Sequence, residues 1–181
     1  MKNILSVLII GLVFMACESP NKKEIEEVNA LLTIASDTEK MLLSVDTARV
    51  FKVKKIMGED FKRLSSFSDT LKKEEAFRIA DIFGSKKKVF RMAKNYTGYF
   101  TQLSLAKKQL SNLKKDLENG LIKDGKFQGY YELEQTALMK LNGDINKYAN
   151  GMDAAIGKYE LERPELLELL EKRKLRATNN E

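Results

Sequence analysis

Apolar residues recur at spacings of three and four from residue 23 onward, and this period is typical of amphipathic α-helices. The first such stripe comprises Ile25, Val28, Leu32, Ala35 and Leu42. A second run follows Asp46 and Thr47, which are residue types that cap helix N-termini. Residues 68–70 form another capping sequence, so the pattern leaves open whether residues 46–83 form one helix or two.

Glycines and a proline mark the boundaries of the later helices. Gly84 followed by Ser85 predicts the end of one helix and the start of another, and the next apolar stripe covers residues 86–118. We interpret residues 120–129, which contain three glycines, as a turn or exposed loop before a last long helix. Pro164 is expected in the first turn of a short terminal helix.

No stretch of the chain keeps the two-residue alternation of a half-buried strand. The sequence therefore predicts an all-α fold, an antiparallel bundle of three or four long amphipathic helices plus a short C-terminal helix. Residues 24–181 are long enough to form a single helical domain around one core.

The first seventeen residues depart from the helical period. Lys2 is followed by an apolar stretch over residues 4–14, and the segment ends with Ala16 and Cys17. An apolar run of this length is typical of a secretory signal peptide and is too short for a transmembrane helix. The segment resembles the type II signal peptide of bacterial lipoproteins. The alternative is an uncleaved apolar anchor with an incidental cysteine.

The resemblance implies a role for the only cysteine of the chain. Residues 1–16 would be removed, Cys17 would be acylated, and the chain would be attached to a membrane of the cell envelope. Glu18, in place of an aspartate after the cysteine, favours the outer membrane, with the chain facing the periplasm or the cell surface. Residues 17–23 would then form a short tether, and at about 3.5 Å per residue it would keep the folded body within roughly 20 Å of the lipid.

Composition excludes several common kinds of active site. The 181 residues include one cysteine and no histidine. A Ser-His-Asp triad, a Cys-His pair and a histidine-ligated zinc site are therefore excluded. The carboxylates fall on exposed helix faces, and the chain has no glycine-rich phosphate loop. We therefore expect a protein without enzymatic activity, cofactor or metal.

Charge is concentrated in the middle of the chain. Residues 46–115 contain 18 lysines and arginines against 7 acidic residues, a net charge of +11. The candidate residues for an anionic partner are Lys52, Lys54, Lys55, Lys86, Lys87, Lys88, Arg91 and Lys94. Export removes nucleic acid from the expected partners and leaves lipid headgroups, lipopolysaccharide phosphates or acidic polysaccharide. The alternative is a set of solvated lysines that pair with acidic residues of the flanking segments.

Three tyrosines are candidates for recognition because the helical period does not explain them as core residues. They are Tyr99, Tyr130 and Tyr131, and the last two lie beside the predicted loop.

Two functions remain open from the sequence. The first is a lipid-anchored envelope protein that acts as a non-enzymatic interaction or structural module, held to the membrane through Cys17 and contacting a protein partner or its own copies. The second is a binding module for an anionic ligand, lipid headgroup or polysaccharide through residues 46–115.

Overall fold

The computed structural model describes residues 21–67, 70–123 and 125–178, and this part of the chain contains α-helices and no strands. The helices are α1 (Lys22–Leu43), α2 (Thr47–Ser65), α3 (Lys73–Ile82), α4 (Lys86–Glu118), α5 (Phe127–Ala149) and α6 (Met152–Thr178). The predicted all-α fold is confirmed. None of the described helices combines the length and the apolar character needed to cross a membrane.

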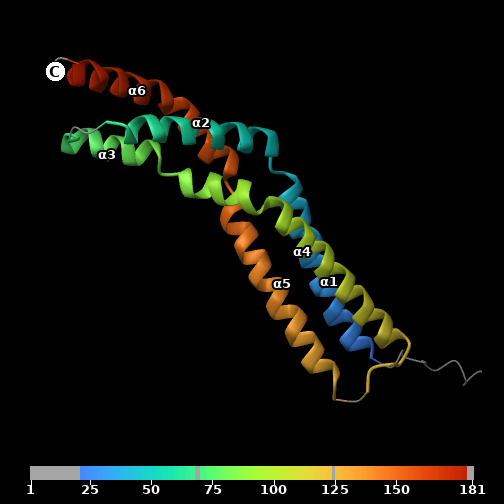
Figure 1. Cartoon of the computed structure of the whole chain (residues 1–181). Helices are drawn as coiled ribbons and strands as arrows, with labels where there is room; N and C mark the ends of the chain where they lie inside the picture. The colour runs from blue at the N-terminus through green and yellow to red at the C-terminus, as the bar shows by residue number, and fades with distance from the viewer. Residues whose placement is uncertain (1–20, 68–69, 124, 179–181) are drawn as a thin grey trace, which may run out of the picture.

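The helices form an elongated molecule with two packing groups that share α4 (Figure 1). At one end α1, α5 and the C-terminal half of α4 pack against one another. At the other end α2 and α6 pack against the N-terminal part of α4 and against each other, and α3 packs against α6 (Figure 1). Because α4 has 33 residues, it is about 50 Å long and extends through both groups.

The segment over residues 46–83 forms two helices. The Asp46 carboxylate accepts a hydrogen bond from the backbone N–H of Arg49 at 2.9 Å, which confirms the predicted cap of α2. The chain leaves α2 after Ser65, and α3 begins at Lys73. Ser68 and Asp69 of the second predicted cap lie outside the described residues.

Both boundaries of α4 agree with the prediction. It begins after the Gly84–Ser85 break and ends at Glu118. Gly120 has a φ of +63°, a conformation that favours glycine, and this turn lets the N–H of Leu121 donate to the carbonyl of Asp116 at 2.9 Å. The following loop is shorter than the predicted range of residues 120–129, since α5 begins at Phe127.

The C-terminal part of the chain differs from the prediction. The last long run is interrupted at Gly151, whose φ of +66° separates α5 from α6. No short helix begins at Pro164, because α6 continues through this residue. Proline removes one intrahelical hydrogen bond, but Glu160, whose carbonyl loses its donor, is exposed and can be hydrated.

Candidate functional site

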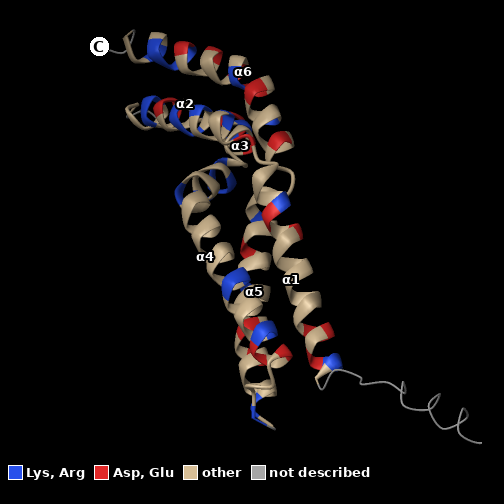
Figure 2. Cartoon of the chain, turned by 90° about the vertical axis from the view of Figure 1, so that its right-hand side faces the viewer, with Lys and Arg blue, Asp and Glu red and all other residues tan. Residues whose placement is uncertain are grey.

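The largest group of the predicted cationic residues lies between α2 and the first turns of α4, where Lys and Arg gather in Figure 2. Two adjoining shallow cavities of about 420 and 390 Å³ share Lys54 and Phe90. From α2 they are lined by Phe51, Lys54, Lys55, Gly58, Glu59 and Lys62, and from α4 by Lys87, Phe90, Arg91 and Lys94. We call this surface the basic groove.

Helical spacing explains why these residues meet. On α2 the groove positions 51, 55, 58 and 62 follow one another at intervals of three and four. On α4 the positions 90 and 91 each lie three or four residues from positions 87 and 94. Buried residues of α2, among them Val53 and Met57, face the core. The groove is therefore the solvent side of a packed helix pair with phenylalanine rings at its centre.

Three arginines of the basic segment are neutralised by acidic residues of α6. The Arg49 guanidinium lies 2.6 Å from the Glu160 carboxylate, and Arg63 lies 3.2 Å from Glu171. Arg78 of α3 contacts Glu165 at 2.6 Å. For these residues the pairing with a flanking acidic segment is confirmed.

The cations of the basic groove have a different environment. Within the described chain, none of the six groove cations contacts a carboxylate within ion-pair distance, although Glu59 lies among them. Their charges remain available, because the acidic residues of α6 contact the opposite side of α2. The groove therefore combines uncompensated positive charge with exposed aromatic surface.

Not all predicted cations belong to the groove. Lys52 is exposed on α2 but lines neither cavity. The Lys86 ammonium lies 2.9 Å from the ring centroid of Phe61, and burial lowers its pKa. The Lys88 ammonium donates to the carbonyl of Asn150 at the junction of α5 and α6. Lys62, which continues the stripe of α2, joins the groove instead.

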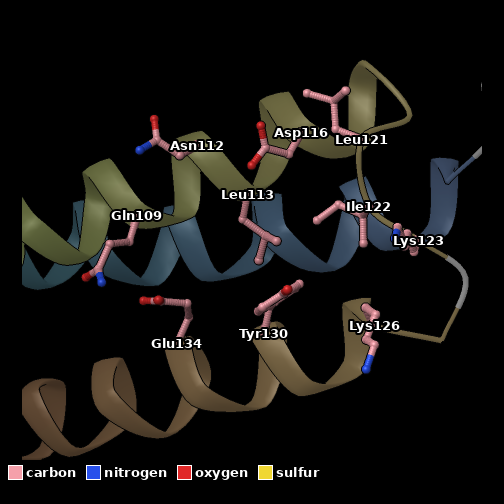
Figure 3. A pocket seen from close by; sticks show the side chains of 10 residues that line it. All are labelled: Gln109, Asn112, Leu113, Asp116, Leu121, Ile122, Lys123, Lys126, Tyr130 and Glu134. Atoms are coloured by element: carbon pink, nitrogen blue, oxygen red, sulfur yellow. The ribbon is translucent and has the colours of Figure 1, made fainter.

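A second cavity, which we call the end pocket, lies where α4 is connected to α5 (Figure 3). Its volume is about 590 Å³, which is within the range of small-molecule sites. From α4 it is lined by Gln109, Asn112, Leu113 and Asp116, from the loop by Leu121, Ile122 and Lys123, and from the start of α5 by Lys126, Tyr130 and Glu134. Burial raises the pKa of the Glu134 carboxyl.

The three candidate tyrosines have three different environments. Tyr130 lines the end pocket and is half exposed. The Tyr131 ring packs against Phe127, and its hydroxyl accepts a hydrogen bond from the Gln135 amide at 3.4 Å. The prediction of a surface role is wrong for Tyr99, which is 6% exposed and belongs to the core. The helical stripe did not reveal this burial because α4 is covered by several helices.

The chain has no significant match among protein-family models, curated proteins or solved structures. Its chemistry must therefore be inferred from the two sites. The described residues contain no cluster of three or more metal-ligating side chains. Cys17, the candidate lipidation site, lies outside the described residues.

Proposed function

We propose that this protein is a lipid-anchored, non-enzymatic helical protein of the cell envelope that binds an anionic partner through the basic groove. The observation that carries the proposal is the group of six cations around Phe51 and Phe90 that form no ion pair with any described residue. The signal-like segment that ends at Cys17 supports export and anchoring.

The lining of the groove also indicates the chemistry of the partner. Lysine and arginine attract phosphate and carboxylate groups, whereas Phe51 and Phe90 offer apolar surface between them. An anion with an attached apolar part satisfies both, and acidic phospholipids and phosphorylated glycolipids have this composition.

The groove lies far from the end of the chain that the proposed anchor would hold. The Asn21 side chain donates to the carbonyl of Leu117 at 3.1 Å, so the start of α1 lies beside the end of α4. Lys94 precedes Leu117 by 23 residues of continuous helix, a distance of about 35 Å. Because α1 begins at Lys22, a tether predicted over residues 17–23 ends two residues earlier, at residue 21. The basic groove is therefore remote from the proposed attachment point.

Vesicle binding tests the groove. The chain that starts at residue 17 and carries Cys17→Ala should bind vesicles of acidic phospholipid, and binding should weaken between about 50 and about 500 mM salt because the Debye length shortens from about 14 to about 4 Å. Replacing Lys54, Lys87 and Lys94 by glutamine should lower the affinity at least tenfold, since each lysine near an acidic surface contributes about 1 kcal/mol.

A matched control variant distinguishes binding at the groove from the effect of net charge on binding. Glutamine at Lys108, Lys115 and Lys140 removes the same charge from exposed positions outside the groove. Equal losses of affinity in the two triple variants would contradict binding at the groove, as would binding that salt leaves unchanged.

The anchor is tested separately with Cys17→Ala in the full chain, which should lose acyl labelling and leave the membrane fraction.

A second candidate function is contact with a helical protein partner or with a second copy of the chain. It is supported by exposed apolar surface on the outer face of α5. Gly129, Leu133, Ala137 and Lys140 line a shallow cavity of about 600 Å³ on this face, and Leu133 is 70% exposed. Sedimentation of the chain with and without Leu133→Asp tests self-association, which the substitution should abolish.

A further inference from the structure

The end pocket is separate from the basic groove and has a different distribution of charge. Gln109 and Glu134 lie at one end, Lys123 and Lys126 lie at the end next to the loop, and Tyr130 lies between them (Figure 3). The pocket is therefore polarised along its length, with carboxylate at one end and ammonium groups at the other.

The acidic part of the pocket lacks a cationic partner. Within the described chain, neither Glu134 nor Asp116 has a side-chain hydrogen bond or an ion pair. Glu134 is partly desolvated by the helices around it, which disfavours its ionised form and raises its pKa. A bound cation would remove this cost, so the geometry favours a ligand with an ammonium group near Glu134.

The middle of the pocket can contact the carbon skeleton of such a ligand. The Tyr130 ring and the Leu113 side chain lie on opposite sides of the cavity (Figure 3). An aromatic ring also attracts an ammonium group through its π face. Leu113 is buried, which provides a fixed apolar wall on the side of α4.

We propose that the end pocket binds a small zwitterion, with its ammonium group at Glu134 and its phosphate or carboxylate group at Lys123 and Lys126. This inference goes beyond the proposed function, since it concerns the other end of the molecule and does not depend on lipidation of Cys17. The zwitterion can be a free metabolite or the headgroup of a phospholipid, because both carry the same pair of charged groups.

The absence of tryptophan from the chain makes the pocket easy to monitor. Tyr130→Trp places the only indole in the pocket, in the full chain kept in a non-ionic detergent. O-phosphoethanolamine should change the fluorescence of this indole with a saturable dependence on concentration. Ethanolamine and inorganic phosphate, each of which carries only one of the two charges, should bind at least tenfold more weakly.

Two substitutions in the Tyr130→Trp chain test which side chain of the pocket binds each charged group of the ligand. Glu134→Gln should weaken the binding of O-phosphoethanolamine at least tenfold. Lys123→Gln should weaken the binding of O-phosphoethanolamine and leave the binding of ethanolamine unchanged. Glu132→Gln is the matched control, because Glu132 lies on the same helix, accepts a hydrogen bond from Gln128 and does not line the pocket. Circular dichroism of each variant verifies that the helices are intact.

Three results would overturn the proposal: no saturable signal from O-phosphoethanolamine, equal binding by the Glu134→Gln chain, or inorganic phosphate that binds as tightly as the zwitterion. The source of the ligand is then tested by competition. Phosphatidylethanolamine carried in the same detergent micelles displaces O-phosphoethanolamine if the pocket accepts a lipid headgroup, and it leaves O-phosphoethanolamine bound if the pocket accepts only the free compound.

Discussion

At the scale of single residues, Asp60 shows how α2 is joined to α6. Its carboxylate is 1% exposed and accepts hydrogen bonds from the Tyr159 hydroxyl and from Nε of Arg163, each at 2.6 Å, and from Nη2 of Arg163 at 3.2 Å. Burial and the hydrogen bond to Asp60 raise the pKa of Tyr159, and the same carboxylate raises the pKa of Arg163. The buried charge is therefore fully hydrogen-bonded.

Removing this charge should destabilise the fold more than removing one of its donors. Asp60→Asn leaves Arg163 without its carboxylate and should lower the free energy of unfolding by about 2 to 4 kcal/mol, less than a fully buried pair because the Arg163 side chain is 34% exposed. Tyr159→Phe should cost about 1 kcal/mol, since Arg163 still contacts Asp60. Urea denaturation followed by circular dichroism measures both, and an Asp60→Asn chain as stable as the parent would contradict the assignment.

At the scale of helices, the two packing groups are held together differently. Exposed ion pairs connect α3 to α6: Arg78 contacts Glu165 at 2.6 Å, and the Asp81 carboxylate lies 2.6 Å from the Lys158 ammonium. Glu75 pairs with Arg176 at 2.6 Å. By contrast, α1, α4 and α5 share mainly buried apolar side chains, among them Val28, Leu110 and Leu138. The α3 and α6 contact is therefore the more sensitive to protonation.

Acid should loosen α3 before it affects the contact of α1 with α4 and α5. Three carboxylates in these ion pairs have a pKa that their cationic partners lower below the usual value, which is 4.5 for glutamate and 3.8 for aspartate. They are Glu75, Asp81 and Glu165. The stability that these groups contribute is present above the unfolded pKa values and is lost as the pH falls through the folded ones. Amide protection factors measured at about pH 6 and about pH 3 should decrease in α3 first; simultaneous loss in α1 and α3 would contradict this order.

At the scale of the whole molecule, two sites of different charge lie at the two ends of α4. The end pocket adjoins the turn at Gly120, close to where α1 begins, and the basic groove includes the first turns of α4 (Figures 1 and 3). A chain anchored through Cys17 would therefore hold the end pocket near the lipid and the basic groove about 35 Å further along α4.

This arrangement predicts different distances of the two sites from an anchoring membrane. The chain that starts at residue 17 carries Cys17→Ala and an N-terminal histidine tag, which holds it on nickel-chelating lipids of neutral vesicles. A fluorophore is attached to the residue introduced by Leu121→Cys or by Lys94→Cys, which is then the only thiol. Energy transfer to an acceptor lipid should be strong from position 121 and weak from position 94. Equal transfer from the two positions would show that the molecule lies along the surface.

Sequence alone determined the helices and several of their ends. Helical period and the turn at Gly120 are local properties, because a stripe depends on residues three and four apart and a positive φ favours glycine wherever it occurs. For the same reason the first stripe identified core residues, including Val28, Ala35 and Leu42. The period did not identify Tyr99 as buried, nor did the proline rule show that α6 continues through Pro164, because both depend on what surrounds the helix.

Only the tertiary structure decided which charges remain available. In the sequence, Arg49, Lys54 and Lys87 belong to one basic segment with a net charge of +11. In the fold, Arg49 contacts Glu160, which lies 111 residues away. Lys54 and Lys87 line the same cavity, and neither has an ion pair with a described residue. Pairing of this kind depends on which helix packs against which, and helical period carries no information about that choice.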